Sequence, residues 1–321
     1  MSTQAPSFLR FQPIYQSRVW GGRVLETRFG RSLPDGETPF GESWEISARE
    51  EADSEVKGGP LSGQTLRQLW SDPAKKADIF GTKAPSEDRF PLLFKILDAR
   101  DKLSIQVHPP AVVAGELGGE PKTEVWYIAH AEPDAELYVG VEPGVTEASF
   151  RAALEDGTAE KVVHAIPVVT GQHIFIPSGR LHAIGAGLLI YEIQQNSDTT
   201  YRVYDWNRKG LDGKPRDLHI EESLKCIDFS DVSPGMDEPD GSLLSECEHF
   251  RLERHPVEEG ESLLSVTEER FAVITVVSGK LSAGDEIFVE GEFFIVPASP
   301  TEELPVAVEG GAEVLLTTWP S

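Results

Sequence analysis

Residues 171–182, GQHIFIPSGRLH, form a short run of β-branched and aromatic side chains that ends in a Pro-x-Gly turn. Similar short runs recur on both sides, each bounded by turn residues: PLLFKILDA (91–99), LSIQVHP (103–109), EVWYIAHA (124–131), AELYVGV (135–141) and LLIYEIQQ (188–195). Many short strands separated by glycine and proline are typical of an antiparallel barrel or jelly roll. The sequence therefore predicts a mainly β fold.

The spacing inside the first stretch is more specific than its composition. Gly171, Pro177, Gly179 and His182 reproduce the pattern G-(x)5-P-x-G-x-x-H of cupins. We therefore expect cupin (jelly-roll) barrels with a few short helices. The β pattern begins again near Cys247, where the run VVSGKLSAGDEIFVEGEFFIVPA resembles a second cupin-like barrel but contains no histidine. We place a metal-binding catalytic cupin domain in residues 1–235 and a smaller, metal-free C-terminal β domain in residues 236–321.

Composition limits the classes of partner. The chain carries 29 Lys and Arg against 54 Asp and Glu, a formal charge of −25, which disfavours nucleic acid and anionic membranes as partners. A small phosphorylated metabolite is compatible with this charge, because two or three converging cations can hold one phosphate. Two cysteines are too few for a disulfide framework. The absence of a signal-like or transmembrane stretch predicts a cytoplasmic protein.

Two further segments supply candidate metal ligands. In SIQVHPP, Gln106 and His108 alternate along one strand and point to the same face, and Glu124 in KTEVWYI can join them from a neighbouring strand. His182 of the cupin motif completes the set. Amide oxygen, imidazole and carboxylate together suit a borderline cation such as zinc and leave coordination positions open, as catalytic sites do.

Longer motifs identify a family. The segments PIYQSRVWGG, FGESWEIS, FKILDARDKLSIQVHP, KTEVWYI and YEIQQNSDTTYRVYDWNR together cover nearly the whole chain. In these segments the sequence resembles the type I phosphomannose isomerases, also called mannose-6-phosphate isomerases, in their short bacterial form.

The resemblance implies an activity and a set of site residues. It implies a zinc-dependent aldose–ketose isomerase of mannose metabolism that interconverts mannose 6-phosphate and fructose 6-phosphate through a cis-enediol. One Zn²⁺ per chain would be held by Gln106, His108, Glu124 and His182. The family's basic active-site residues map onto Lys95, Lys122, Arg202 and Arg208, and Ser104 matches a position near the substrate phosphate. We expect a monomer or a weak homo-oligomer.

The isomerisation needs a base, for which the sequence offers three candidates. Lys122 is preferred, because it shares a strand face with Glu124, and a nearby cation with partial burial is expected to lower its pKa. Glu192 and Asp198 stay open as alternatives, and Glu192 is also a candidate substrate-binding residue. Arg202 is expected to stabilise the enediolate. The resemblance places Ser104, Lys95 and Arg208 in the site, and they are expected to bind the phosphate because their hydroxyl and cationic donors suit a dianion.

Two other functions compete with the isomerase. A non-catalytic cupin that binds a sugar phosphate would lack a ligand or a base, whereas this sequence has candidates for all of them. An iron-dependent cupin oxygenase usually has more histidine ligands, so Gln106 argues against it.

Overall fold

The computed structural model describes residues 8–263, 270–298 and 304–320, and these form two compact units. We call Tyr15–Ser43 with Lys95–Asp237 the site unit. The companion unit consists of the segment ending at Ile14, Trp44–Phe94 and the residues from Glu238 onward. No helix in the described part of the chain is both long and apolar enough to cross a membrane.

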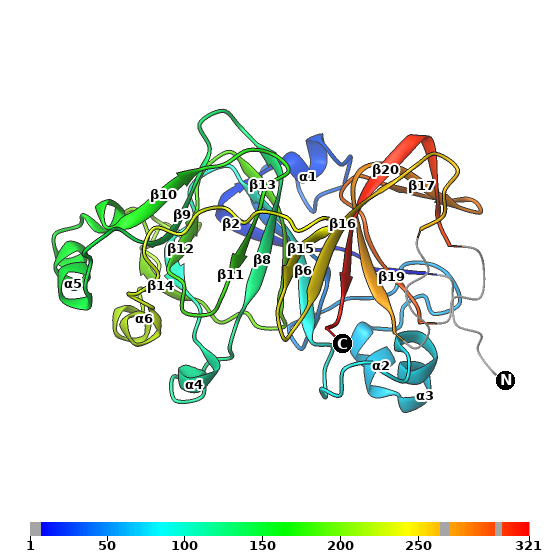
Figure 1. Ribbon diagram of the computed structural model, residues 1–321, viewed down its shortest axis with the longest axis horizontal. Coiled ribbons are helices and arrows are strands. Elements are labelled where there is room, and N and C mark those ends of the chain that lie inside the picture. Colours follow the sequence, from blue (N-terminus) through cyan, green and yellow to red (C-terminus); the bar gives the residue numbers. More distant parts are fainter. Residues whose placement is uncertain (1–7, 264–269, 299–303, 321) are drawn as a thin grey trace. The chain divides into compact units, whose positions relative to one another are not determined.

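Two sheets build the barrel that contains the candidate ligands (Figure 1). One has the strand order β10 (Val163–Pro167), β9 (Glu136–Val141), β12 (His182–Ile184), β7 (Ile105–Val107) and β14 (Tyr201–Tyr204). The other has the order β11 (His173–Ile176), β8 (Glu124–Ala131), β13 (Leu188–Gln195), β6 (Leu92–Ala99), β2 (Ile14–Gly22) and β3 (Phe40–Ile46). Leu137 and Ile184 of the first sheet share one buried core with Trp126 and Ile190 of the second. The predicted mainly β cupin fold is confirmed.

Short helices cover the outer face of the first sheet. They are α5 (Glu147–Glu155) and α6 (Ile220–Cys226). Shorter helical segments elsewhere in the site unit are α1 (Val24–Thr27), α4 (Ala111–Ala114) and the 3-10 turn η2 (Ala159–Lys161). The side chain of Thr146 accepts a hydrogen bond from the backbone N–H of Ser149 and so starts α5. Phe150 of α5 and Leu224 of α6 are buried against the sheet.

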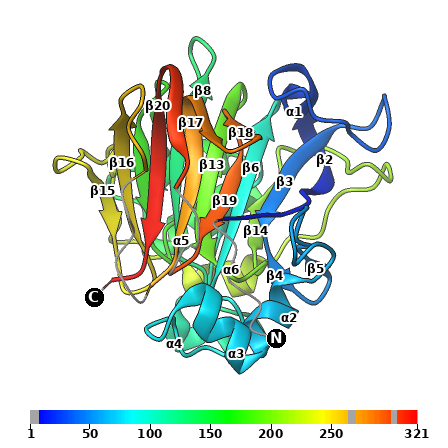
Figure 2. The ribbon, with the colours of Figure 1, turned by 90° about the vertical axis from the view of Figure 1, so that its right-hand side faces the viewer.

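The companion unit has its own sheet. Its strand order is β1 (Leu9–Arg10), β19 (Phe293–Val296), β17 (Ala272–Ala283), β20 (Val306–Thr318), β16 (Arg251–Val257) and β15 (Leu243–Glu246), with β18 (Glu286–Val289) on β17. Figure 2 shows these strands side by side. The unit also contains the pair β4 (Ala48–Arg49) and β5 (Ala52–Asp53), and α2 (Leu66–Ser71), α3 (Pro73–Lys75) and the π-helical turn η1 (Lys76–Phe80).

The two units do not correspond to the predicted division of the chain at one position. The site unit ends at Asp237, next to the predicted boundary at residue 235, but residues 44–94, which the sequence analysis placed in the catalytic domain, group with the C-terminal residues. Aromatic packing explains part of this grouping: Trp70 and Phe90 contact Phe271, which in turn contacts Trp319. The division into domains at residues 235 and 236 stays a prediction.

Candidate metal centre

Strand register brings the candidate ligands together. Gln106 in β7 is paired with His182 of β12 on one side and with Arg202 of β14 on the other. His108 follows β7 directly, so its side chain lies one alternation further along the same strand face. Glu124 begins β8 in the opposite sheet, where it pairs with Gln194 of β13. The cluster therefore lies inside the barrel, between its two sheets.

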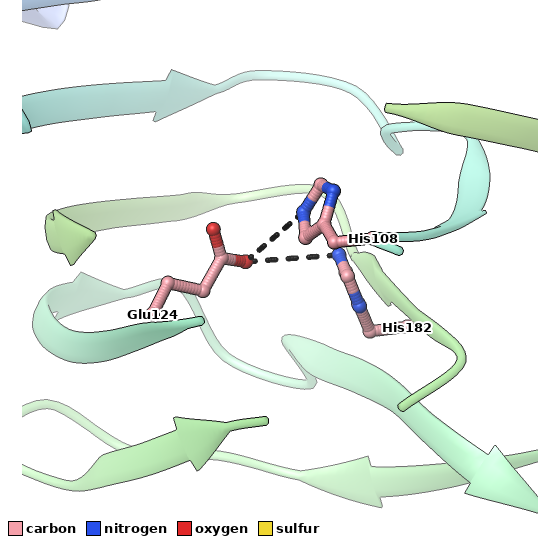
Figure 3. Close-up of side chains that lie close together, drawn as sticks. All are labelled: His108, Glu124 and His182. Carbon is pink, nitrogen blue, oxygen red and sulfur yellow. Dashed lines mark ion pairs between the residues drawn. The ribbon is translucent and has the colours of Figure 1, made fainter. Parts of the chain in front are cut away.

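The two imidazoles direct the same nitrogen at the carboxylate (Figure 3). Nε2 of His108 lies 3.5 Å and Nε2 of His182 lies 3.7 Å from Oε1 of Glu124. On the far side of each ring, Nδ1–H donates to a backbone oxygen at 2.9 Å, that of Thr199 for His108 and that of Arg180 for His182. These bonds fix the tautomer, so both Nε2 lone pairs face the cluster, as in metal-binding histidines.

The side chains at the cluster fit a metal ion. Both carboxylate oxygens of Glu124 are buried: Oε2 pairs with Nζ of Lys122 at 2.7 Å, whereas Oε1 faces the unprotonated Nε2 atoms of the two histidines and so accepts no hydrogen bond from them. Ligand atoms of His108, Glu124 and His182 lie within 4.8 Å of one another. The Gln106 amide reaches the same point, with Nε2 3.3 Å from Nε2 of His182, while its oxygen accepts from Ser104 Oγ. A half-turn of the amide exchanges its two terminal atoms and gives the oxygen the ligating position.

Burial and neighbouring charges set the protonation states of these three side chains. Burial lowers the pKa of His182 to about 3, with the charge of His108 adding to the effect. Burial and then the charge of Lys122 lower the pKa of His108. Both rings are therefore neutral near pH 7. Burial alone would raise the pKa of Glu124, but Lys122 and the two histidines outweigh it and hold this pKa well below its usual range. One carboxylate and two neutral imidazoles are protonation states that bind zinc.

Lys122 lies beside the cluster, and carboxylates surround its ammonium group. Its Nζ is 2.7 Å from Oε2 of Glu124, 3.2 Å from Nε2 of His108 and 3.8 Å from Oε1 of Glu192. Burial lowers the pKa of this lysine, but the charges of Glu124, Glu192 and Asp198 together raise it above its ordinary value. The expected lowering of the Lys122 pKa depends on a metal cation nearby and stays a prediction, because the rise described here comes from the carboxylates around the ammonium.

Side chains of opposite charge follow one another from Lys122 through Glu192 and Lys95 to Glu42. Oε1 of Glu192 lies 3.3 Å from Nζ of Lys95, and its other oxygen accepts from the Trp126 indole at 3.0 Å. Nζ of Lys95 is also 3.7 Å from Oε2 of Glu42. Burial and then the charge of Glu124 raise the pKa of Glu192. Glu192 is thus a buried carboxyl group held between two lysines.

A cavity of about 580 Å³ opens next to the cluster. Its walls include most of the side chains selected from the sequence, namely Lys95, Ser104, Gln106, Lys122, Glu192, Asp198 and Arg202. Arg208 does not line it, because its guanidinium is bound to Asp205 and donates to the backbone oxygen of Lys102. Four charged wall residues were missed by the sequence analysis: Arg18, Glu42, Asp212 and Arg216. Arg18 lies in the quoted segment PIYQSRVWGG, whereas no spacing signal marks Arg216.

Known proteins resemble this chain over most of its length. A family model described as the catalytic domain of phosphomannose isomerase type I matches residues 8–117. The mannose-6-phosphate isomerase ManA of Bacillus subtilis is 34% identical over 98% of this chain and 99% of its own length. A mannose-6-phosphate isomerase of Streptococcus mutans is 44% identical over 69% of this chain and 67% of its own length.

Solved structures agree with these relatives. The crystal structure of the mannose 6-phosphate isomerase from Bacillus subtilis has a TM-score of 0.84 at 31% identity, covering 97% of this chain and 99% of that one. A mannose 6-phosphate isomerase bound with zinc and yttrium has a TM-score of 0.71 at 16% identity, covering 98% of this chain and 100% of that one, a likeness of fold.

Proposed function

The chain belongs to the type I phosphomannose isomerases and is a mannose-6-phosphate isomerase, and from this premise we propose that it works through a cis-enediol in the cavity beside Lys122. One observation carries the proposal. A lysine amine lies on the cavity wall and within 3.2 Å of a buried cluster that fits a metal ion. The small-molecule substrate would be mannose 6-phosphate or fructose 6-phosphate. The cytoplasmic location and the monomeric or weakly oligomeric state stay predictions.

The metal we propose is one Zn²⁺ per chain, held by Gln106, His108, Glu124 and His182. The neutral histidines, the ionised Glu124 and its Oε1 atom, which faces both histidines, support this choice. When bound there, zinc would supply a Lewis acid that polarises the carbonyl of the sugar and stabilises negative charge on its oxygens.

Lys122 is the proposed base. Its amine takes the proton from C2 of the aldose, which leaves a cis-enediolate that becomes the cis-enediol when O1 is protonated, and the resulting ammonium returns a proton to C1 to give the ketose. The hydroxyl proton passes from O2 to O1 in the same conversion, so no atoms are gained or lost. The amine must be neutral to accept a proton, and its pKa falls once another cation compensates the charge of Glu124. Glu192, at 3.8 Å from Lys122, is the second candidate for this role.

Other side chains of the cavity wall would bind and orient the sugar. Arg202 donates through Nε to Ser104 Oγ at 3.2 Å and lies across from Gln106 in the sheet. We propose that its charge stabilises the enediolate oxygens. Ser104, Lys95 and Glu192 are proposed to contact the substrate, because all three line the cavity.

Isomerisation in D₂O tests the proton transfer. Proton NMR of the products is expected to show deuterium at C1 of fructose 6-phosphate formed from mannose 6-phosphate, because a solvent-exchangeable base carries the proton. Turnover with no deuterium incorporation would contradict the cis-enediol route. Substrate binding without turnover by the zinc-loaded protein would favour the rival function, a non-catalytic sugar-phosphate-binding cupin.

A further inference from the structure

Two chain segments pass from one sheet of the barrel to the other beside the candidate metal centre. Residues 115–123 lead from α4 to β8, and residues 196–200 lead from β13 to β14. β14 and the strand before α4, β7, belong to one sheet, whereas β8 and β13 belong to the other. The first segment contains Lys122 and the second contains Thr199. We call them the lysine crossover and the threonine crossover.

Two hydroxyl groups of the threonine crossover hold one residue of the lysine crossover. The backbone N–H of Glu120 donates to Oγ1 of Thr199 at 3.0 Å, and the backbone oxygen of Glu120 accepts from Oγ of Ser197 at 3.2 Å. The backbone N–H of Thr199 donates to the same Ser197 oxygen at 3.2 Å, so the two hydroxyl groups are fixed relative to each other. Both backbone polar groups of Glu120 are therefore bound by the other crossover.

The two crossovers also touch at Gly119. A Cβ atom at this position would lie 2.7 Å from Cγ2 of Thr199 and 2.8 Å from the hydroxyl oxygen of Tyr201. The Tyr201 hydroxyl donates to the backbone oxygen of Leu117 at 3.2 Å. A side chain at residue 119 would push the crossovers apart, so their close approach requires glycine there.

Lys122 lies between two anchored residues. On one side is Glu120, held by the two hydroxyl groups. On the other side, the N–H of Thr123 donates to Oε1 of Gln195 at 2.9 Å, and its backbone oxygen accepts from the N–H of Gln195 at 3.0 Å. Pro121 adds a restricted φ angle between them. The end of β13 and the threonine crossover therefore determine the backbone position of Lys122.

Thr199 holds the metal centre as well. Its backbone oxygen accepts from Nδ1–H of His108 at 2.9 Å. Nζ of Lys122 lies 3.2 Å from Nε2 of the same imidazole and 2.7 Å from Oε2 of Glu124. Thr199 thus contacts a candidate ligand through its carbonyl group and the segment that carries the lysine through its hydroxyl group. Such a link matters for catalysis, because a misplacement of about 1 Å can cost about 100-fold in rate.

We propose that Thr199 is a positioning residue for the isomerisation and sets the place of the Lys122 amine relative to His108. Its hydroxyl acts through Glu120, and Ser197 supports it through the same residue. The inference rests on the proposed function for the role of Lys122 as the base. Thr199 does not line the cavity in the described part of the chain, so its hydroxyl affects kcat rather than KM.

Thr199→Val tests the proposal, because valine keeps the branched shape and the backbone oxygen but lacks the hydroxyl. In zinc-loaded enzymes, we expect Thr199→Val to lower kcat about 10-fold and to change KM less than about threefold. Thr199→Ser, which keeps the hydroxyl, should restore kcat to within about threefold of the parent. Thr170→Val is the matched control: Oγ1 of Thr170 accepts from the backbone N–H of Ala131 at 3.0 Å on an exposed turn, and kcat should stay unchanged.

Lys122→Met separates positioning from a general loss of structure. If Thr199 acts through Lys122, Thr199→Val should lower the residual kcat of Lys122→Met less than about twofold. A second comparison needs no turnover and uses urea unfolding of the metal-free protein. Lys122→Met should lower the urea midpoint by at least about a third less in the Thr199→Val background than in the parent, because the lysine is then already displaced from Glu124.

The outcomes separate this inference from the proposed function. Parental kcat in folded Thr199→Val, an equal loss in Thr199→Ser, or an equal loss in the Lys122→Met background would overturn the inference and leave the isomerase intact. If the parent has no turnover, or Lys122→Met keeps the parental kcat, the proposed function or its base is wrong and the urea comparison decides. A reduced midpoint loss then supports the positioning of Lys122 by Thr199, and additive losses overturn it.

A second variant covers a failure of Thr199→Val to fold. Ser197→Ala removes the other hydroxyl that binds Glu120 and is compared with Lys122→Met in the same two measurements. A loss of kcat that disappears in the Lys122→Met background supports the inference. A loss of equal size in both backgrounds, or no loss at all, overturns it.

Discussion

Replacing Lys122 by Met separates two roles of this lysine, proton transfer and compensation of Glu124. Methionine has nearly the same length and shape but no charge. Nζ of Lys122 lies 2.7 Å from Oε2 of Glu124, and both side chains are buried. With an effective dielectric constant of about 20, the attraction at this distance is roughly 6 kcal/mol before desolvation. Removing one partner of such a pair destabilises a protein by about 3–5 kcal/mol, because the other charge stays buried. We expect this loss in the metal-free protein.

Zinc should change the effect of the substitution. In the zinc-loaded protein Glu124 has another cationic partner, so Lys122→Met should cost little stability. If zinc takes over this role completely, the thermodynamic cycle requires Lys122→Met to bind zinc about 100- to 4,000-fold more tightly than the parent, since each 1.4 kcal/mol is a factor of ten. Activity should fall although zinc binds more tightly, because loss of the base is expected to lower kcat by about 100- to 10,000-fold.

Three measurements check this prediction: urea unfolding with and without zinc, competitive zinc titration, and turnover of mannose 6-phosphate. Lys225→Met is the control, because Lys225 pairs with Glu116 at 3.2 Å on the exposed surface, where such pairs contribute little. Equal destabilisation of Lys122→Met with and without zinc would refute the electrostatic reasoning. A kcat of Lys122→Met within fivefold of the parent would indicate that the base is Glu192 or Asp198 instead.

Other substitutions test separate parts of the molecule. The Asp98 carboxylate accepts a hydrogen bond from the backbone N–H of Val24, and burial raises its pKa from 3.8 to about 6. Ionisation of Asp98 therefore opposes folding. The stability that protonated Asp98 contributes is fully present below pH 3.8 and is lost as the pH rises through 6. Asp98→Asn should therefore raise the free energy of unfolding at pH 8 by about 3 kcal/mol and leave it unchanged at pH 3; equal gains at both pH values in urea unfolding would contradict this. Phe271→Ala should remove about 3–5 kcal/mol from the companion unit, because this buried ring contacts Trp70, Phe80, Phe90 and Trp319, and thermal unfolding would show it. Glu124→Gln should weaken zinc binding at least about 100-fold in a chelator competition, and retention of parental affinity would remove Glu124 from the ligand set.

The fold and the clustering of His108, Glu124 and His182 were accessible from the sequence because local rules fix them. Gly171 and Gly179 adopt φ angles of 90° and 94°, which favour glycine, so the cupin spacing records a backbone requirement. Strand alternation likewise places Gln106 and His108 on one face, and register with β12 then adds His182. Each of these constraints acts over a few residues or between adjacent strands.

The other features of the site and of the two units depend on contacts between residues that are far apart in the sequence. Arg216 reaches the cavity through Asp205, a pairing that no periodicity reveals. The sequence places zinc ligands near Lys122 but does not show that Glu192, on a strand 70 residues away, also faces it. Glu192 is one of the carboxylates that raise the pKa of Lys122. Residues 44–94 join the companion unit through aromatic contacts such as that between Trp70 and Phe271.

The central claim is that a metal held by Gln106, His108, Glu124 and His182 enables aldose–ketose isomerisation. Formation of fructose 6-phosphate from mannose 6-phosphate, followed in a coupled assay before chelation, after complete metal removal and after zinc is returned, tests it most directly. We predict turnover that disappears with the metal and returns with zinc. Turnover that persists undiminished in the fully metal-free protein, or its absence in the zinc-loaded protein, would contradict the claim.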